Sequence, residues 1–390
     1  MSTTIIPATW MRGGTSKGLF LNSENLPQDP VTRDKLLLAA IGSPDPYGKQ
    51  IDGLGGATSS TSKIVLIKPS EKEGFDVDYT FGHIAIDQPL IDYSGNCGNL
   101  SAAVGVFAIE QGMVEVDPSR ANLPDITPVR VWQTNLSQKM VIHVPTSDGQ
   151  VLYEDQYSIA GIPNNGSPIK VEFIKPGTKN GTVLPTGHVT ESLNLENGCQ
   201  ITASLINAGN ATVFLTAESL GLIGTELPDE INSDTALLEK VEKIRCAAAV
   251  AMGLAQTVEQ AEKQPGTPKL SFVSKAKTYQ TTQGCSLEAN EMDLCARIFS
   301  MGKLHHAFTG TGAIAIAIAA SIPGTLVADI LEKDEDDSEI LHIGHSAGLI
   351  ESSASVEKID GHWIAHNASL LRTARTLMRG EVFIPDHYLT

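Results

Sequence analysis

Two uncharged apolar stretches stand out from the mixed pattern of hydrophobic and polar positions along the chain. The first, Leu100–Ile109, has one apolar face at helical spacing, while Val106 and Ile109 add apolar side chains on other faces. The second, Ala313–Ala320, alternates isoleucine with alanine, which also fits a strand, but its alanine content and length favour a helix. Because a helix that is apolar on all sides is buried, we predict two central helices.

Shorter patterns predict the elements around these helices. Asp34–Ile41 and Thr235–Leu254 have the periodicity of helices, and Ile64–Ile67 and Lys269–Val273 are predicted to be strands. Glu291–Phe299 is predicted to be a helix, because it holds two apolar residues four positions apart. The sequence therefore indicates an α+β fold.

A run of small residues precedes each predicted central helix. Cys97-Gly98-Asn99 precedes the first and Thr309-Gly310-Thr311-Gly312 the second, which indicates an internal duplication. We expect two like domains, residues 1–182 and 183–390, with the last strand, about 378–390, packing back on the first domain. Two positive helix ends facing one cleft would compensate a multiply charged anion.

The charge and the cysteines narrow the class of protein. With 45 acidic and 28 basic residues, the formal charge is −17, so the chain has no broad basic surface for nucleic acid. Five cysteines without a CxxC pair indicate neither a zinc knuckle nor a disulfide framework, and fit a reducing cytoplasm. The first residues lack the pattern of a secretory signal, and glycines and a proline interrupt the uncharged stretch Ala307–Ala328, so we expect a cytoplasmic protein without a membrane span.

Cys97 is the candidate reactive residue. It ends a run of small, flexible residues directly before an apolar helix, so backbone N–H groups and the positive helix end would face its sulfur. This pattern predicts an anion site beside a reactive cysteine. Its expected binding residues are Asn96, Gly98 and Asn99.

The segment Trp10–Gly18 is a second candidate for anion binding. Three glycines allow a close approach of the backbone to a ligand, and Arg12 and Lys17 bracket two hydroxyl residues. The segment does not meet the P-loop pattern, and a plain hairpin turn is the structural alternative. The expected binding residues are Arg12, Gly13, Gly14, Thr15, Ser16 and Lys17.

Lys63 ends Asp52–Lys63, a run of twelve residues that are almost all small or hydroxyl-bearing, and it stands where a strand begins. A lysine at such a boundary is usually solvated. Held near apolar strand residues, it would lose solvation of its charged form and suit proton transfer near neutral pH. Both interpretations stay open, and Ser62 is a candidate binding residue beside it.

The second half of the chain offers weaker candidates. Asn207 is either a turn former or a carboxylate ligand, and His345 either a ligand contact or a turn residue. His305 and His306 cannot both reach one metal from a helix, and no third ligand has a suitable spacing, so we expect no metal site. The expected binding residues of this half are Asn207, Lys303, His305, Thr309, Gly310, Thr311 and His345.

Six runs of residues give the sequence a resemblance to the PrpF family. They are Met11–Gly18, Gly42–Pro46, Gln50–Gly53, Gly55–Lys63, Ser94–Asn99 and Ser300–His306. They extend from residue 11 to beyond residue 300, so the resemblance covers essentially the whole chain. That family contains 2-methylaconitate cis–trans isomerase and related isomerases of unsaturated di- and tricarboxylates, with the fold of diaminopimelate epimerase.

The resemblance implies two pseudo-symmetric domains, each a barrel-like sheet around a central helix, and proton transfer by Lys63 and Cys97. In the epimerase relatives a second cysteine faces the first, whereas the matching position here is Thr309. A threonine hydroxyl has too high a pKa to replace that thiol. We therefore expect an allylic proton shift without a cofactor, with the assignment of base and acid left open.

The resemblance implies 2-methylaconitate cis–trans isomerisation in propionate catabolism as the function. Aconitate isomerase, methylitaconate isomerase and 4-oxalomesaconate tautomerase are the enzymatic alternatives. A non-enzymatic alternative is an accessory partner of an aconitase-like iron–sulfur enzyme. The expected ligand is thus a small di- or tricarboxylate, and a homo-oligomer is left open.

Overall fold

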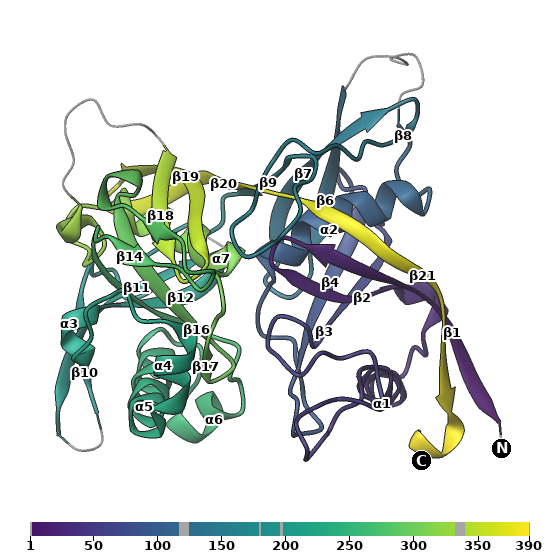
Figure 1. The fold of residues 1–390 in the computed structure, drawn as a ribbon, viewed down its shortest axis with the longest axis horizontal. Coiled ribbons are helices and arrows are strands. Elements are labelled where there is room, and N and C mark those ends of the chain that lie inside the picture. Colours follow the sequence, from purple (N-terminus) through teal and green to yellow (C-terminus); the bar gives the residue numbers. More distant parts are fainter. Residues whose placement is uncertain (1, 117–124, 179–180, 196–197, 332–339, 390) are drawn as a thin grey trace. The chain divides into compact units, whose positions relative to one another are not determined.

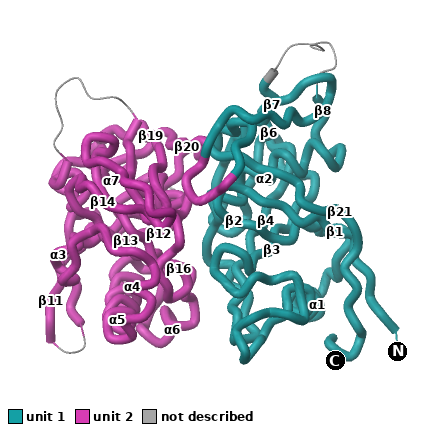
Figure 2. The backbone as a smooth tube through the Cα atoms, in the orientation of Figure 1, with its two compact units in different colours: residues 1–158, 164–171, 372–390 teal, residues 159–163, 172–371 magenta. Residues whose placement is uncertain are grey.

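The computed structural model describes residues 2–116, 125–178, 181–195, 198–331 and 340–389. They form a mixed α+β structure, which divides into two compact units (Figure 2). Unit 1 consists of residues 1–158, 164–171 and 372–390, and unit 2 of residues 159–163 and 172–371.

Unit 1 contains a run of strands with alternating antiparallel and parallel neighbours. The strands β1 (Thr3–Gly13) and β2 (Ser16–Asn22) form an antiparallel hairpin, and β2 pairs in parallel with β3 (Lys63–Pro69). Next come β4 (Val77–Ile84), antiparallel to β3, then β6 (Asp125–Gln133), parallel to β4, and β7 (Gln138–Ser147), antiparallel to β6. The strand β21 (Ala374–Pro385), yellow in Figure 1, lies antiparallel beside β1.

Unit 2 repeats the same order of pairings. The strands β11 (Gln200–Ala208) and β12 (Asn210–Thr216) form the hairpin, and β13 (Lys269–Lys275) is parallel to β12. Then β16 (Leu294–Ser300) is antiparallel to β13, β18 (Ile340–His345) parallel to β16, and β19 (Gly348–Ile359) antiparallel to β18. Because five successive pairings agree in direction, the two units are internal repeats, as the sequence predicts.

The remaining strands are short or extend these runs. They are β5 (Ile91–Asp92), β8 (Gln150–Val151), β9 (Ile169–Ile174), β10 (Glu191–Asn194), β14 (Tyr279–Gln280), β15 (Ser286–Leu287), β17 (Lys303–Leu304) and β20 (His362–Arg372).

Each unit has one apolar helix surrounded by strands. In unit 1, α2 (Gly98–Glu110) contacts β1, β2, β6, β7, β8 and β21, and its residues 98–109 are all buried (Figure 1). In unit 2, α7 (Gly310–Ala320) contacts β11, β12 and β19, and all its residues are buried. The prediction of two central helices is thus confirmed, including the choice of a helix for the alternating isoleucines and alanines.

The other helices lie on the outside of the sheets and have recognisable end signals. The helix α1 (Pro30–Ile41) begins after Asp29, whose carboxylate accepts a hydrogen bond from the N–H of Thr32, and ends at Gly42 with φ 81°. Unit 2 carries α3 (Ala217–Leu220), α4 (Pro228–Ser233), α5 (Thr235–Ala251) and α6 (Val258–Glu262). The predicted helices at 34–41 and 235–254 are confirmed within a few residues.

The helix predicted over Glu291–Phe299 is wrong. A 3₁₀ turn at Ala289–Glu291 is followed by the strand β16, and every residue of that strand is buried. Because both faces are covered, the strand lacks the alternation of polar and apolar residues that distinguishes a half-exposed strand from a helix.

The compact units divide the chain at residues 158, 163, 171 and 371. The domains expected from the sequence, residues 1–182 and 183–390, are meant as independently folding parts of the chain. These domain boundaries stay a prediction. Across the residues that the structure describes, no helix has both the length and the hydrophobicity to cross a membrane.

Candidate active site

The tip of the β1–β2 hairpin packs against the first turn of α2. Its loop is Gly14–Thr15, and Gly14 has φ 50°. A Cβ added at Gly13 would lie 2.6 Å from the backbone oxygen of Asn99, and one at Gly14 would collide with the Asn99 side chain. Glycine is therefore required here for a close approach as well as for the turn. The segment is a hairpin turn that brings Thr15 and Ser16 to the N-terminus of α2.

Lys63 is the first residue of β3, and its side chain is 5% exposed. Its Nζ donates a hydrogen bond to Oγ of Ser16 at 2.9 Å and lies 3.4 Å from Sγ of Cys97. The ring centroid of Phe81 is 5.9 Å from the same nitrogen. The interpretation of Lys63 as a solvated residue is therefore wrong, since the side chain is enclosed by its neighbours.

Cys97 is the N-cap residue of α2, and its sulfur accepts a hydrogen bond from the N–H of Leu100 at 3.5 Å. The N–H of Cys97 itself donates to Oδ1 of Asn96 at 2.6 Å, which fixes the residue at the start of the helix. Two donors, the Leu100 N–H and the Lys63 ammonium, thus point at the sulfur. Together with the helix N-terminus, they would stabilise negative charge on it.

Asn99 connects the hairpin to a residue near the end of the chain. Its Nδ2 donates to Oγ1 of Thr15 at 3.0 Å, and its Oδ1 accepts a hydrogen bond from Nε of Arg372, also at 3.0 Å. Arg372 is buried, and burial lowers its pKa to about 10. A buried guanidinium beside the N-terminus of α2 adds positive charge to the place where an anion was predicted. The sequence reasoning missed Arg372, because nothing local marks it.

Arg12 holds the hairpin in place. Its Nη1 donates to the backbone oxygens of Gly14 at 3.1 Å and Thr373 at 2.9 Å. Burial, and then repulsion from Arg375, lowers the pKa of Arg12 to about 10. The structure thus engages one guanidinium nitrogen of Arg12 in backbone contacts, whereas the sequence predicted carboxylate capture.

The contacts of Lys17 and Ser62 are with residues other than Cys97. Lys17 follows Ser16 in a strand, so its side chain points to the opposite face, where its Nζ lies 5.8 Å from the ring centroid of Trp10. Ser62 is fully buried, and its hydroxyl donates to Oε1 of Gln50 at 2.6 Å. Ser62 thus supports the chain before Lys63.

Tyr79 is a further residue that the sequence reasoning missed. Its side chain is fully buried, and burial, followed by negative charge at Cys97, raises its pKa well above the usual 10. Tyr79 therefore stays a neutral neighbour of the sulfur, whereas the nitrogen of Lys63 is in hydrogen-bond contact with it.

Unit 2 presents the same arrangement with different side chains. A Cβ at Gly209, the tip of the β11–β12 hairpin, would lie 3.4 Å from the backbone oxygen of Thr311 in the first turn of α7. Thr309 is the N-cap residue, and its Oγ1 accepts a hydrogen bond from the N–H of Gly312 at 3.1 Å. Thr309 thus takes the place of Cys97, and Gly310 begins the helix as Gly98 does in α2.

A buried lysine also recurs in unit 2. Lys269 is the first residue of β13, as Lys63 is of β3, and its Nζ donates to Oγ of Ser300 at 3.3 Å. The strand pattern Lys269–Val273 was visible in the sequence, but its correspondence to Lys63 depends on the strand order. The repeat therefore retains a lysine and replaces the thiol by a hydroxyl.

The remaining candidates of unit 2 are held by backbone contacts. His305 and His345 are both 2% exposed, and the Nδ1 of each ring accepts a hydrogen bond from a backbone N–H two residues later. Asn207 donates its N–H to the backbone oxygen of Val183 at 2.9 Å, and Lys303 is exposed in β17. Within the described residues, no three His, Cys, Asp or Glu side chains are grouped as metal ligands.

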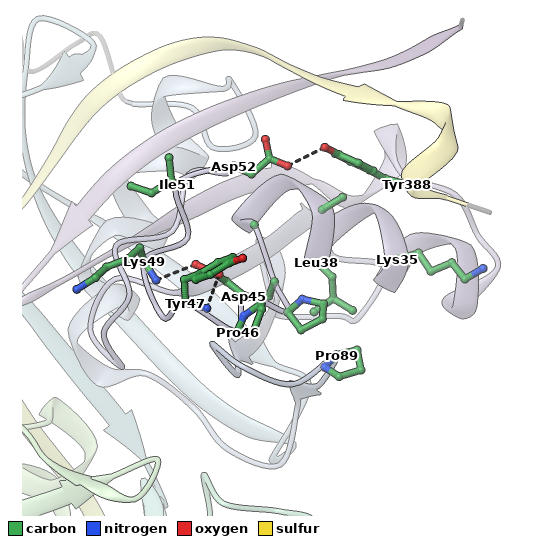
Figure 3. A pocket seen from close by; sticks show the side chains of 14 residues that line it. Lys35, Leu38, Asp45, Pro46, Tyr47, Lys49, Ile51, Asp52, Pro89 and Tyr388 are labelled. Carbon is green, nitrogen blue, oxygen red and sulfur yellow. Dashed lines mark hydrogen bonds between the residues drawn. The ribbon is translucent and has the colours of Figure 1, made fainter.

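A cavity of about 620 Å³ lies elsewhere in unit 1 (Figure 3). It is lined by residues of α1, by the turn that follows α1, by Pro89 and by Tyr388. Neither Lys63 nor Cys97 is among the lining residues. The cavity is therefore separate from the lysine and thiol.

Comparisons with known proteins match nearly the whole length of the chain. The family described as PrpF protein matches residues 3–385. A protein of Cupriavidus necator named 2-methyl-aconitate isomerase is 45% identical over 388 residues, covering 97% of each chain. A protein of Eubacterium barkeri named 3-methylitaconate isomerase is 39% identical over 383 residues, again covering 97% of each chain.

Solved structures agree with the fold. A crystal structure of a methylitaconate-delta-isomerase matches with a TM-score of 0.76 and 37% identity, covering 100% of this chain and 98% of the other. A hydroxyproline epimerase of Agrobacterium vitis matches with a TM-score of 0.53 and 12% identity, covering 97% and 92% of the two chains, which supports the epimerase-like fold alone.

Proposed function

Because the chain belongs to the PrpF family and is an isomerase, we propose that it interconverts cis and trans 2-methylaconitate by moving a proton with Lys63 and Cys97. The observation that supports this proposal is the 3.4 Å contact between Nζ of Lys63 and Sγ of Cys97 at the N-terminus of α2. An amine and a thiol, two groups that can exchange protons, are in contact there. Both are buried, and the positive end of the helix dipole lies beside them.

The reaction needs one proton to leave and one to return. One group removes a proton from the carbon next to the double bond, and the electron pair spreads into the conjugated carboxylate. The former double bond gains single-bond character, so rotation about it becomes possible. A proton then returns, so the product differs from the substrate only in geometry or in the position of the double bond. No redox change occurs in this sequence.

Lys63 takes the main role as base or acid, with Cys97 as its partner. The two can pass a proton directly at their separation of 3.4 Å, and Ser16 Oγ holds the lysine nitrogen on its other side. The carboxylates of the substrate, and the negative charge that develops during the reaction, would be stabilised by the N-terminus of α2 and by the buried guanidinium of Arg372. The binding roles expected for the residues of unit 2 stay predictions.

The choice of substrate follows the relatives. The relative from Cupriavidus necator at 45% identity is named for 2-methyl-aconitate, while relatives named for methylitaconate and oxalomesaconate are 39% and 36% identical. A pocket that accepts a methyl group differs from one that does not by about 1–3 kcal/mol of contacts. A functional pairing with an aconitase-like enzyme stays a prediction.

A substrate panel followed by proton NMR tests the proposal. Purified protein is mixed in D₂O with 2-methylaconitate, aconitate, methylitaconate or 4-oxalomesaconate, and the alkene and methyl signals are followed with time. We expect the fastest change with 2-methylaconitate, together with deuterium uptake at the carbon beside the double bond.

Two outcomes contradict the proposal. Faster conversion of another acid would reassign the substrate, and conversion without any deuterium uptake would argue against proton exchange with solvent through Lys63 and Cys97. The matched control is Lys63→Met, which keeps the length and apolar stem of the side chain but removes the nitrogen that contacts Ser16 and Cys97.

A further inference from the structure

We propose that Gln50 is a positioning residue that holds Lys63 in place, an inference that rests on the proposed role of Lys63. Gln50 is 1% exposed and has φ 50°, in the left-handed region that glutamine rarely adopts. A buried polar side chain in that conformation needs compensating contacts. The contacts that it makes lead toward Lys63.

The amide of Gln50 ties three parts of one loop together. Its Nε2 donates to Oγ of Ser43 at 2.8 Å. Its Oε1 accepts two hydrogen bonds, from the N–H of Ala57 at 2.8 Å and from the hydroxyl of Ser62 at 2.6 Å. The glutamine therefore holds the middle and the end of the run of small residues that precedes Lys63.

Gly55 shows how closely this loop is wrapped around the amide. A Cβ at Gly55 would collide with Oε1 of Gln50 and lie 2.7 Å from the backbone oxygen of Ile41. A side chain at this position would push the loop off the glutamine, which explains why the run is poor in bulky residues.

Ser62 links the Gln50 amide to Lys63. It is fully buried and directly precedes Lys63, and its backbone oxygen accepts a hydrogen bond from Ile84 on one side while its hydroxyl is held by Gln50 on the other. Since Lys63 begins β3 at this point, the direction of its side chain depends on how the preceding residue is held. Losing the Gln50 contact would let the ammonium shift away from Ser16 and Cys97.

Asp45 shapes the turn that presents Gln50. Its carboxylate accepts hydrogen bonds from the N–H groups of Tyr47, Lys49 and Gln50, at 2.9, 2.7 and 2.5 Å. Figure 3 labels Asp45, Tyr47 and Lys49 at this turn and marks hydrogen bonds there with dashed lines. Residues of this turn therefore line the cavity, and the turn also places the Gln50 amide where it accepts the hydrogen bond from Ser62.

The test replaces Gln50 by leucine, which has a similar volume but cannot form the three hydrogen bonds. A shift of about 1 Å at a catalytic group can cost as much as about a hundredfold in rate. We expect kcat of Gln50→Leu for the best acid of the panel to fall about tenfold or more, with little change in KM. Gln50→Glu keeps the acceptor oxygen for Ala57 and Ser62, so we expect it to retain most of the rate.

A second readout does not depend on turnover. The rate at which iodoacetamide alkylates Cys97 is measured by peptide mass spectrometry at one neutral pH, with the exposed Cys199 as an internal reference. Lys63→Met gives the rate without the ammonium, and we expect Gln50→Leu to shift from the wild-type rate toward that value. If wild-type protein isomerises no acid, the proposed function fails, while the alkylation rates still decide about Gln50.

The control is Thr325→Val in unit 2. Thr325 is fully buried, and its hydroxyl ties Ala319 to Ala328, so the variant loses two hydrogen bonds far along the chain from Lys63. It should lower the thermal midpoint as Gln50→Leu does, without changing kcat or Cys97 alkylation. Unchanged kcat and alkylation in Gln50→Leu would overturn the inference. If that variant does not fold, Ser62→Ala replaces it, and two unchanged readouts there overturn the inference equally.

Discussion

Nε of Arg372 donates a hydrogen bond to Oδ1 of Asn99, which precedes it by 273 residues in the chain, at a distance of 3.0 Å. This contact decides which way the Asn99 amide faces, because its Nδ2 then points to Thr15 at 3.0 Å. The guanidinium, the amide and the hydroxyl therefore form one hydrogen-bonded row beside the first turn of α2.

Replacing Arg372 should weaken substrate binding. In Arg372→Met the Asn99 amide loses its fixed orientation and the site loses a buried positive charge, so we expect KM for the anionic substrate to rise by about tenfold or more. Steady-state kinetics with the best acid of the panel measures this change. Arg375→Met is the matched control, because Arg375 is an exposed arginine three positions later. Equal KM values for both variants would contradict the role given to Arg372.

Replacing Lys63 should remove most of the activity. General acid–base groups typically contribute about 10²–10⁴-fold to a rate, so kcat of Lys63→Met should fall within that range. Cys97→Ser should fall as well, since a hydroxyl exchanges protons far less readily than a thiol. Circular dichroism establishes that the variants are folded. Near wild-type rates in both folded variants would exclude the pair as the proton-transfer groups.

Thr309 gives a prediction about stability. Its hydroxyl caps α7 by accepting the Gly312 N–H, so Thr309→Ala should lower the free energy of unfolding by about 1 kcal/mol. Thr309→Ser keeps the capping oxygen and should lose less. Urea unfolding followed by circular dichroism measures the difference. An equal loss in the serine and alanine variants, which both lack the methyl group, would show that the methyl group, and not the cap, stabilises the helix.

Asp45 gives a prediction about pH. Three backbone hydrogen bonds, with the one from Tyr47 first, lower the pKa of its carboxyl below the usual 3.8. A carboxyl with a lowered pKa in the folded state stabilises the protein above its unfolded pKa, and this contribution disappears as the pH falls through the lower, folded value.

The thermal midpoints of wild type and Asp45→Asn should therefore differ at neutral pH and converge as the pH drops below about 4. The exposed Asp87 supplies the control variant, Asp87→Asn, which has no such network to lose. A constant difference between wild type and Asp45→Asn over the whole pH range would mean that the carboxylate charge does not matter to the turn.

Patterns among neighbouring residues were sufficient to predict those parts of the fold that are determined by neighbouring residues. The apolar helices α2 and α7 are confirmed because their sequences exclude any exposed face. The place of Cys97 at a helix N-terminus was predictable because the helix start and the small residues before it are adjacent in the chain. The strand β16 was mistaken for a helix, because full burial of both faces removed its alternation.

Residues that act over long sequence distances could not be found in this way. Arg372 meets Asn99 only because β21 returns to β1, and Lys269 corresponds to Lys63 only through the order of strands in the two units. Gln50 stands within a recognisable motif, but its contact with Ser62 depends on a turn that Asp45 shapes. The sequence around Lys63 and Cys97 was thus sufficient to mark them as candidates. The contacts of Arg372 and Gln50 depend on the fold and could not be predicted from neighbouring residues.

The pairing of β21 with β1 has a consequence for the order of events during protein synthesis. Lys63 and Cys97 leave the ribosome early, but unit 1 also needs residues 372–390, which are made only after the whole of unit 2. Unit 2 ends at residue 371, so all of its residues are synthesised before residues 372–390 of unit 1. The nascent chain therefore has to keep an incomplete first sheet from aggregating until its final strand arrives.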